Sequence, residues 1–307
     1  MSGKSLNFLH LTHTQNNNLG YNLKEEDKIM NFLHREESPL TAQEWQTIDN
    51  IVVNTARNQL VGRRFIELTQ ALDPAIQSVA YDTIPSLDNG ACGLFGDKEC
   101  GIAKIKSRRF LPIPQIYKDF KIHWRDIETS RRLNIPLDVS VVALATREVA
   151  LAEDRFIFHG DSEIGYPGLL NVEGRSIIKN KNFDEEGGIF KTALACVETL
   201  VEKGFSKNLA YILNPKDYTK AFRIYGNSGV LEITHIKELF DVGVFTSHAV
   251  DEGKTIAVAT GVENVDIFLV QDMISAFIDY ENMDYYFRVF EILAFRIKNP
   301  SAVVTTE

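Results

Sequence analysis

The sequence predicts a mixed α+β fold built around one long helix and one extended arm. Of its 307 residues, 44% are hydrophobic and 24% are charged, which is enough to bury two compact domains or one larger body. Apolar residues recur at helical spacing over residues 138–159, and this length predicts a helix of about 30 Å. Strand-like alternation occurs over residues 110–124 and again near the C-terminus.

The first ordered element is predicted to be a helix over residues 41–61. Thr41 can cap it, and Glu44, three residues later, completes a capping box. Gly62 marks its end. The apolar side chains at helical spacing are Trp45, Ile48, Val52, Ala56 and Leu60.

An extended arm is predicted to follow this helix. The stretch LDNGACGLFGDKECG places glycines among turn residues, as at the tip of a long hairpin. On the return, Phe120, Ile122 and Trp124 alternate with polar residues, which is a strand pattern. An arm that cannot bury much of its own surface is expected to lie on another molecule, although an exposed hairpin with a solvated charge cluster fits equally. The basic residues of the arm are Lys104, Lys106, Arg108 and Arg109.

The long helix is predicted to begin at Asp138, which can cap it, and to end at Gly160. A separable unit is expected over residues 164–254, with helices at 189–203, 216–223 and around 233–239 and one strand in LAYILNP. Strands then return in TIAVATG, DIFLVQD and YYFRVFEILAFRIK.

Composition disfavours several classes of protein. The net charge of −9 disfavours a nucleic-acid binder, which needs a basic face. Uncharged apolar runs fall short of the roughly 20 residues that span a bilayer, and the N-terminal residues lack the apolar core of a secretory signal. Cys92, Cys100 and Cys196 are too few for a disulfide framework, so free thiols in a reducing cytoplasm are expected.

Each candidate for catalysis lacks a required partner. GDSEIG is similar to the nucleophile block of a serine hydrolase, but no Asp-x-x-His follows it. In GGIFKT, Phe190 stands where a phosphate loop has glycine. His10 and His13 lack further metal ligands at a known spacing, and His159 is expected to interact with a helix C-terminus. The sequence therefore predicts a structural or binding protein with no catalytic residues and no metal.

Several blocks follow one another in a characteristic order. They are FLHREESPLTAQEWQTID, NQLVGRRFIEL, YKDFKIHWRDIE, NIPLDVS, EDRFIFHG, GYPGLLNV, GVLEITHIKEL and FRVFEILAFRIKNPSAVV. From about Phe32 to Val304, this collinear order resembles the encapsulins, bacterial and archaeal proteins that build hollow compartments. The resemblance covers close to the whole chain after Met30.

The resemblance implies the fold of tailed-bacteriophage major capsid proteins, with a peripheral domain that holds a long spine helix, an extended loop and an axial domain. It also implies many copies in closed icosahedral symmetry. The implied boundaries are 1–29 for an N-terminal extension or translated leader, 30–75 for the N-terminal helix and the start of the peripheral domain, 76–122 for the extended loop, 123–163 and 255–307 for the peripheral domain, and 164–254 for the axial domain.

The resemblance also implies a site for a short targeting peptide at the C-terminus of a cargo protein. The matching positions are Leu60, Arg63, Phe65 and Glu67. The two apolar side chains would form a groove, and the two charged ones would fix the peptide register. The alternative is that Leu60 and Phe65 are core and that Arg63 pairs with Glu67.

Two further sites are implied. The stretch YGNSG, comprising Tyr225, Gly226, Asn227, Ser228 and Gly229, matches a pore loop at the fivefold axis, and its small uncharged residues would pass ions and small solutes with little charge selection. An ordinary turn is the alternative. Trp124 matches a tryptophan that stacks a flavin in some relatives, with a simply packed aromatic as the alternative. No cofactor is otherwise required, and iron would enter only through the cargo.

The leading hypothesis is therefore a cytoplasmic shell subunit that is not itself an enzyme. Its partners would be further copies of itself and a cargo protein, with a ferritin-like iron-oxidising protein for iron storage and oxidative-stress protection first and a dye-decolorising peroxidase second. The competing hypotheses are a prophage-type capsid protein that packages DNA and a flavin-linked enzyme that uses Trp124. From the acidic net charge and the short apolar runs, no nucleic-acid or membrane partner is expected.

Two features depart from the resemblance. Residues 69–74 lack the Gly-Pro-Leu-Gly turn of many relatives, which leaves the arm angle and the shell size open. The tetrapeptide Asn-Phe-Leu-His occurs at 7–10 and again at 31–34, and the resemblance begins at the second copy. Residues 24–27 can be encoded by a purine-rich ribosome-binding sequence before Met30, which favours a translated leader over residues 1–29. A genuine arm of that length could stretch over about 90 Å and cover the cargo groove.

Overall fold

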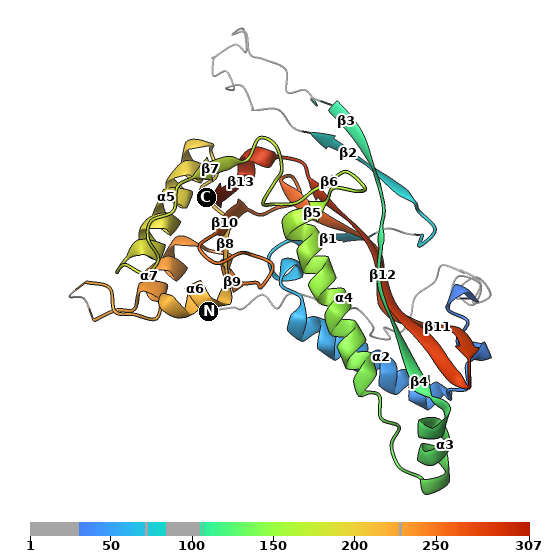
Figure 1. The fold of residues 1–307 in the computed structure, drawn as a ribbon. Coiled ribbons are helices and arrows are strands. Elements are labelled where there is room, and N and C mark those ends of the chain that lie inside the picture. Colours follow the sequence, from blue (N-terminus) through green and yellow to red (C-terminus); the bar gives the residue numbers. More distant parts are fainter. Residues whose placement is uncertain (1–30, 71–72, 84–104, 106, 227–228) are drawn as a thin grey trace, which may run out of the picture.

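The computed structural model describes residues 31–70, 73–83, 105, 107–226 and 229–307. The predicted glycine-rich tip of the arm, with Cys92 and Cys100, lies outside the described residues, and so do His10 and His13. Within the described chain, two lobes are visible, one around long strands and long helices and one around a smaller sheet (Figure 1).

The first lobe is a four-stranded sheet covered on one face by two helices (Figure 1). Its strand order is β1-β11-β12-β4, and β1 is parallel to β11 whereas the other neighbours are antiparallel. The covering helices, α2 and α4, pack on each other and on this sheet around Ile48, Val52, Val142 and Phe287. The elements are β1 (Glu67–Gln70), β4 (Gln115–His123), β11 (Val265–Glu281), β12 (Asp284–Ile297), α2 (Ala42–Gln59) and α4 (Ser140–His159).

Both long helices follow the sequence prediction closely. The Thr41 hydroxyl accepts a hydrogen bond from the amide of Glu44, and the Glu44 carboxylate accepts one from the amide of Thr41, so the predicted capping box is confirmed. At α4, the Asp138 carboxylate accepts from the amide of Ser140 at 2.9 Å. Gly160 ends α4 with φ 68°, a conformation that favours glycine.

The second lobe is a five-stranded sheet in the order β7-β13-β10-β8-β9. Its core packs α5 and α7 against the sheet through Ile189, Tyr211, Ile236 and Phe240. Because β10 and β13 come from beyond residue 254, the implied end of the axial domain divides this sheet. The elements are β7 (Ser176–Ile178), β8 (Leu209–Leu213), β9 (Gly243–Thr246), β10 (Thr255–Ala259), β13 (Val303–Thr306), α5 (Gly188–Glu202), α6 (Pro215–Lys220) and α7 (Glu232–Leu239).

The arm leaves the first lobe as a two-stranded antiparallel ribbon of β2 (Ser78–Thr83) and β3 (Ser107–Pro112) (Figure 1). Val79, Tyr81 and Leu111 bury one face of the ribbon against the main core. Phe110 points the other way and is 70% exposed. The predicted single return strand is divided, because β3 ends at Pro112 and β4 joins the four-stranded sheet.

The prediction that Trp124 ends a strand is wrong. The strand β4 ends at His123, and Trp124 begins a helix, α3 (Trp124–Leu133), that the sequence analysis missed. Half of its ten residues are charged, and Ile127 alone is buried, so there was no apolar stripe to detect. The remaining short elements are η1 (Asn31–Leu33), η2 (Arg35–Glu37), η3 (Gly62–Arg64), η4 (Pro300–Ala302), β5 (Gly160–Asp161) and β6 (Tyr166–Pro167). Within the described part of the chain, no helix is both long and apolar enough to cross a membrane.

Candidate functional site

Three of the four predicted cargo-binding side chains are buried in the subunit. Leu60, Arg63 and Phe65 are 3%, 4% and 5% exposed. The ring of Phe65 packs between those of Phe158 and Phe245, so it belongs to the core, as the alternative interpretation held. Glu67 is exposed on β1. Peptide binding at these positions stays a prediction, and in this subunit only Glu67 is open to a partner.

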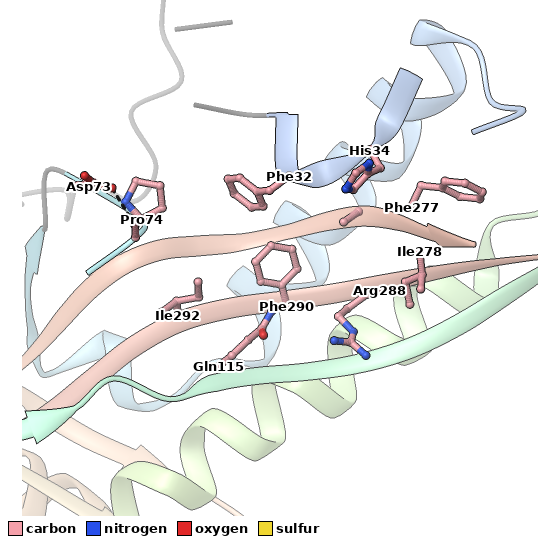
Figure 2. Close-up of a pocket in the computed structure, with 12 residues that line it drawn as sticks. Phe32, His34, Asp73, Pro74, Gln115, Phe277, Ile278, Arg288, Phe290 and Ile292 are labelled. Carbon is pink, nitrogen blue, oxygen red and sulfur yellow. Dashed lines mark hydrogen bonds between the residues drawn. The ribbon is translucent and has the colours of Figure 1, made fainter. Parts of the chain in front are cut away.

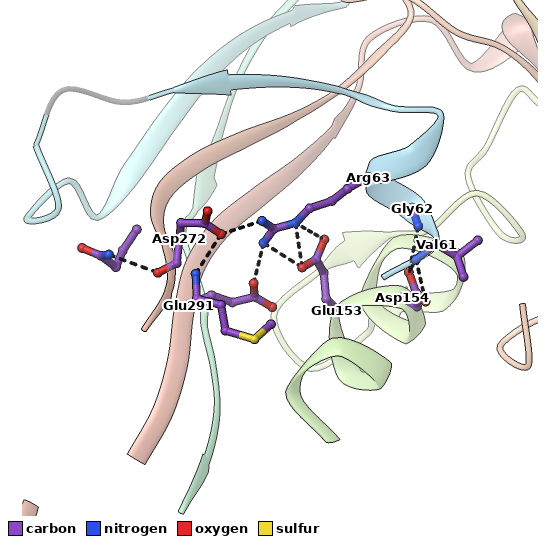
Figure 3. A network of polar contacts seen from close by, with 9 residues as sticks. Val61, Gly62, Arg63, Glu153, Asp154, Asp272 and Glu291 are labelled. Carbon is purple, nitrogen blue, oxygen red and sulfur yellow. Dashed lines mark hydrogen bonds and ion pairs between the residues drawn. The ribbon is translucent and has the colours of Figure 1, made fainter. Parts of the chain in front are cut away.

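Arg63 lies at the centre of a buried charge network with Glu153, Asp272 and Glu291, so the alternative in which it pairs with Glu67 is wrong (Figure 3). Its guanidinium donates to Glu153 of α4 at 2.8 Å, to Asp272 of β11 at 2.7 Å and to Glu291 of β12 at 2.5 Å. The strand pairing of β11 and β12 shifts register between Gln271 and Ile274, and Asp272 lies in this irregular stretch. One side chain thus joins the turn after α2 to the spine helix and to both long strands.

The network holds more carboxyl groups than cations. Burial raises the pKa of Glu291 well above its usual value, and the nearby Glu153 charge raises it further. The single positive charge of Arg63 lies between the partly exposed Asp272 and the buried Glu153.

Asp154, next to this network, fastens the end of α2 to α4 (Figure 3). Its carboxyl oxygen Oδ1 accepts hydrogen bonds from the amides of Val61 at 3.1 Å and Gly62 at 2.9 Å. Gly62 fits because a Cβ there would come within 2.4 Å of the Ile157 side chain. Burial raises the pKa of Asp154 to about 7, although the hydrogen bond from Gly62 opposes the shift.

Asp154 should make the stability of the subunit depend on pH. Between pH 3.8 and about 7 the folded chain holds a proton on Asp154 that the unfolded chain releases, so the contribution of this group to stability is largest at acidic pH and is lost as the pH rises through about 7. Each unit of pKa shift corresponds to about 1.4 kcal/mol. Asp154→Asn should flatten this part of the pH dependence in denaturant unfolding, whereas Asp126→Asn on the exposed face of α3 should not. An unchanged slope in Asp154→Asn would contradict this assignment.

An apolar groove of about 730 Å³ opens beside the start of the described chain (Figure 2). It lies between η1, the face of β11 and β12 away from α4, and the segment that follows β1. Ile278 is 44% exposed in it, and Arg288, Gln115 and Asp73 supply polar groups at its edges. Its remaining lining residues are Phe32, His34, Pro74, Ala75, Ala276, Phe277, Phe290 and Ile292.

The second Asn-Phe-Leu-His copy already occupies one side of this groove (Figure 2). Leu33 is 2% exposed and packs on Ala276 and Phe290. The ring of Phe32 meets that of Phe290 edge-on, with centroids 6.3 Å apart. This part of the molecule therefore holds the short helical segment η1 through an adjacent aromatic and aliphatic pair.

Trp124 is half-buried beside a cavity of about 550 Å³ that Tyr280, Met283 and Tyr285 also line. The guanidinium of Arg125 lies 5.7 Å from its ring centroid. An aromatic-lined cavity of this size fits a planar ring, and flavin binding at Trp124 stays a prediction. Within the described ranges, no three His, Cys, Asp or Glu side chains gather as ligands for a metal ion.

Tyr225, the first residue of the expected pore loop, is held by packing against neighbouring rings. The ring of Tyr225 packs on Phe190 and His235, with centroids 5.3 and 5.8 Å away, and a Cβ on Gly187 would come within 2.3 Å of it. Asn227 and Ser228 lie outside the described residues, and Gly226 and Gly229 flank them with positive φ. A pore at Tyr225–Gly229 stays a prediction.

The other candidates for chemistry occupy structural positions. His159 is the last residue of α4, and its Nε2 lies 2.5 Å from the carbonyl oxygen of Ala249. Cys196 is buried in α5, and burial raises the pKa of its thiol to about 12. Asp161 caps the turn after α4 by accepting from the amide of Glu163. Phe190 packs in α5, with its amide held by Glu232.

The fold is that of a capsid-forming shell protein. The virus-like particle from Pyrococcus furiosus matches with a TM-score of 0.71 at 22% identity, over 86% of this chain and 99% of that one. The capsid of Myoviridae phage XM1 matches with a TM-score of 0.58 at 11% identity, over 80% of this chain and 90% of that one. The predicted α+β fold of tailed-phage capsid proteins is thereby confirmed.

Sequence comparison then gives the family. The family model described as "Encapsulating protein for peroxidase" matches residues 30–294. The type 1 encapsulin shell protein EncA of Myxococcus xanthus is 38% identical over 90% of this chain and 96% of its own length. This chain belongs to the encapsulin family, as its sequence blocks indicated.

Two further relatives join a shell to a second protein. A diheme-cytochrome-encapsulin shell fusion protein of Kuenenia stuttgartiensis is 33% identical over 87% of this chain and 74% of its own length. A ferritin-like-encapsulin shell fusion protein of Pyrococcus furiosus is 26% identical over 68% of this chain and 56% of its own length.

Proposed function

We propose that this encapsulin subunit assembles into a closed icosahedral shell in the cytoplasm and encloses a ferritin-like cargo. The observation that best supports shell assembly is the match to EncA along nearly the whole of both chains. The exposed Phe110 face of the arm, which has no cover within the described subunit, supports a many-copy assembly. The ferritin-like fusion relative supports the class of cargo and hence a role in iron storage.

Within this proposal, the groove beside Phe32 receives the C-terminal tail of the cargo. The groove is open, it is apolar at its base, and Arg288 and Asp73 can fix the direction of a bound tail. The packing of Phe32 and Leu33 on Phe290 shows how an apolar pair is held there. In this proposal the cargo tail binds in this groove and not at Leu60 and Phe65, which are buried.

The experiment has two stages. Shells are purified from the native organism, the enclosed protein is identified by mass spectrometry, and its C-terminal tail is fused to a fluorescent protein. The fusion is then co-expressed with the full chain, with Ile278→Asp and with the control Val262→Asp, whose site lies outside the groove but is similarly exposed at 42%.

Ile278→Asp should reduce the loading of the fluorescent fusion by about tenfold, because a charge at the base of the groove must be desolvated. The control should load like the unmodified chain. Equal loading in all three would exclude the groove as the cargo site, and an enclosed protein unrelated to ferritins would contradict the proposed cargo class.

A further inference from the structure

We propose that the first Asn-Phe-Leu-His copy, residues 7–10, binds in the open part of the Phe32 groove and so occupies it from within the same chain. The inference that this segment occupies the groove depends only on the shape of the groove and on the repeated tetrapeptide. Its consequence, that the N-terminal segment competes with cargo for the groove, rests on the proposed function.

The resident copy shows how this surface holds an adjacent Phe-Leu pair. In the second copy, Leu33 is buried on Ala276 and Phe290, and Phe32 lies edge-on to Phe290. The first copy offers the same adjacent pair, Phe8 and Leu9, in the same order. A surface that holds one such pair by apolar contact has the chemistry to hold another beside it.

The resident copy leaves room for a second one (Figure 2). Phe32 remains 43% exposed and Ile278 44% exposed, so the apolar surface continues past the resident segment. The remaining space of about 730 Å³ is lined on its far side by Pro74, Ala75 and Ile292. A cavity of this size is typical of sites that bury a ligand with several apolar groups.

The second copy keeps its own place because the residue after it is an anchor. Arg35 donates to the carbonyl oxygen of Ser275 and to both carboxylate oxygens of Asp49, and its guanidinium lies 4.5 Å from the Trp45 ring centroid. The first copy is followed by Leu11 and Thr12 and has no such anchor. It is therefore expected to add beside the second copy and not to displace it.

The tether between the copies permits this arrangement. Residues 11–30 separate them and can span at most about 65 Å when extended, whereas the groove begins at Phe32 itself. A tether of this length gives an effective concentration on the order of millimolar. A weakly binding apolar pair can occupy the groove at such a concentration.

Photocrosslinking in the assembled full-length chain tests the occupancy. Phe8 is replaced with p-benzoylphenylalanine, and adducts are mapped by mass spectrometry after irradiation. The matched control carries the same group at Tyr21, an aromatic residue of the same segment outside the repeat. We expect adducts from position 8 on Ile278, Phe290 or Ile292, at about tenfold higher yield than from position 21. Equal yields from both positions, or adducts from position 8 only elsewhere, would overturn the proposal.

Cargo loading separates this inference from the proposed function. Phe8→Ser/Leu9→Ser should raise loading of the fluorescent tail fusion by about threefold or more, and Asn16→Ser/Asn17→Ser should leave it unchanged. If the tail loads into none of these shells while position 8 still crosslinks to the groove, the proposed cargo site fails and the occupancy stands. If crosslinking succeeds and all variants load equally, competition with cargo is refuted.

Discussion

Arg63→Met should lower the free energy of unfolding of the subunit by about 3–5 kcal/mol, because it leaves Glu153 and Glu291 buried without their common cation. The loss should be smaller at acidic pH, where protonation removes the stranded charge. Denaturant unfolding at several pH values measures both effects. The same substitution should loosen the joint between η3, α4 and β12, which one guanidinium holds together.

Two further variants make this result specific to the network. Arg108→Met breaks an exposed ion pair with Asp82 on the arm and should leave the unfolding midpoint unchanged. Adding Glu153→Leu and Glu291→Met to Arg63→Met should restore most of the lost stability, since apolar side chains can replace a buried charge cluster. An Arg63→Met chain as stable as the original would contradict the burial of this network.

Phe110→Asp should prevent shell formation while leaving the subunit folded. Phe110 is 70% exposed on β3, opposite Ala80 on β2, and the ribbon face that carries it is open to a further surface. If that surface belongs to a neighbouring copy, each contact loses about 1–3 kcal/mol when a carboxylate must be desolvated there, and the loss recurs in every copy. Size-exclusion chromatography and mass photometry should then show small oligomers in place of large particles.

Phe110→Tyr is the matched control, because it keeps the aromatic ring and adds one polar atom. It should assemble like the unmodified chain, and circular dichroism should show the same secondary structure in both variants. Large particles formed by Phe110→Asp in normal yield would mean that this face of the arm is not an assembly contact.

Local signals explain why the long helices could be predicted. The start of α2 depends on Thr41 and Glu44, which lie next to the residues they cap, and its buried stripe repeats within single turns. The order of the sequence blocks predicted the capsid-like fold, whereas periodicity alone predicted only individual helices and strands. The helix α3 was not predicted because Ile127 is its one buried residue, and a single buried residue gives no periodic apolar pattern.

The candidate site could not be predicted in the same way, because its partners are distant in sequence. Arg63 meets Glu153 and Glu291 only after the chain has folded α4 and β12 together, and nothing beside Arg63 announces them. One signal was present: Glu291 stands inside the apolar stretch VFEILAF, where a charge must be paired or neutral. The groove likewise joins residues from both ends of the chain, so only the repeated tetrapeptide pointed towards it.

The central claim is that this chain builds a closed capsid-like shell. Cryo-electron microscopy of the purified full-length chain tests it most directly, because the image shows the assembly itself. The account predicts hollow particles with icosahedral symmetry, in which the β2–β3 ribbon and Phe110 lie against a neighbouring copy. Monodisperse small oligomers, with Phe110 still open to solvent, would contradict it.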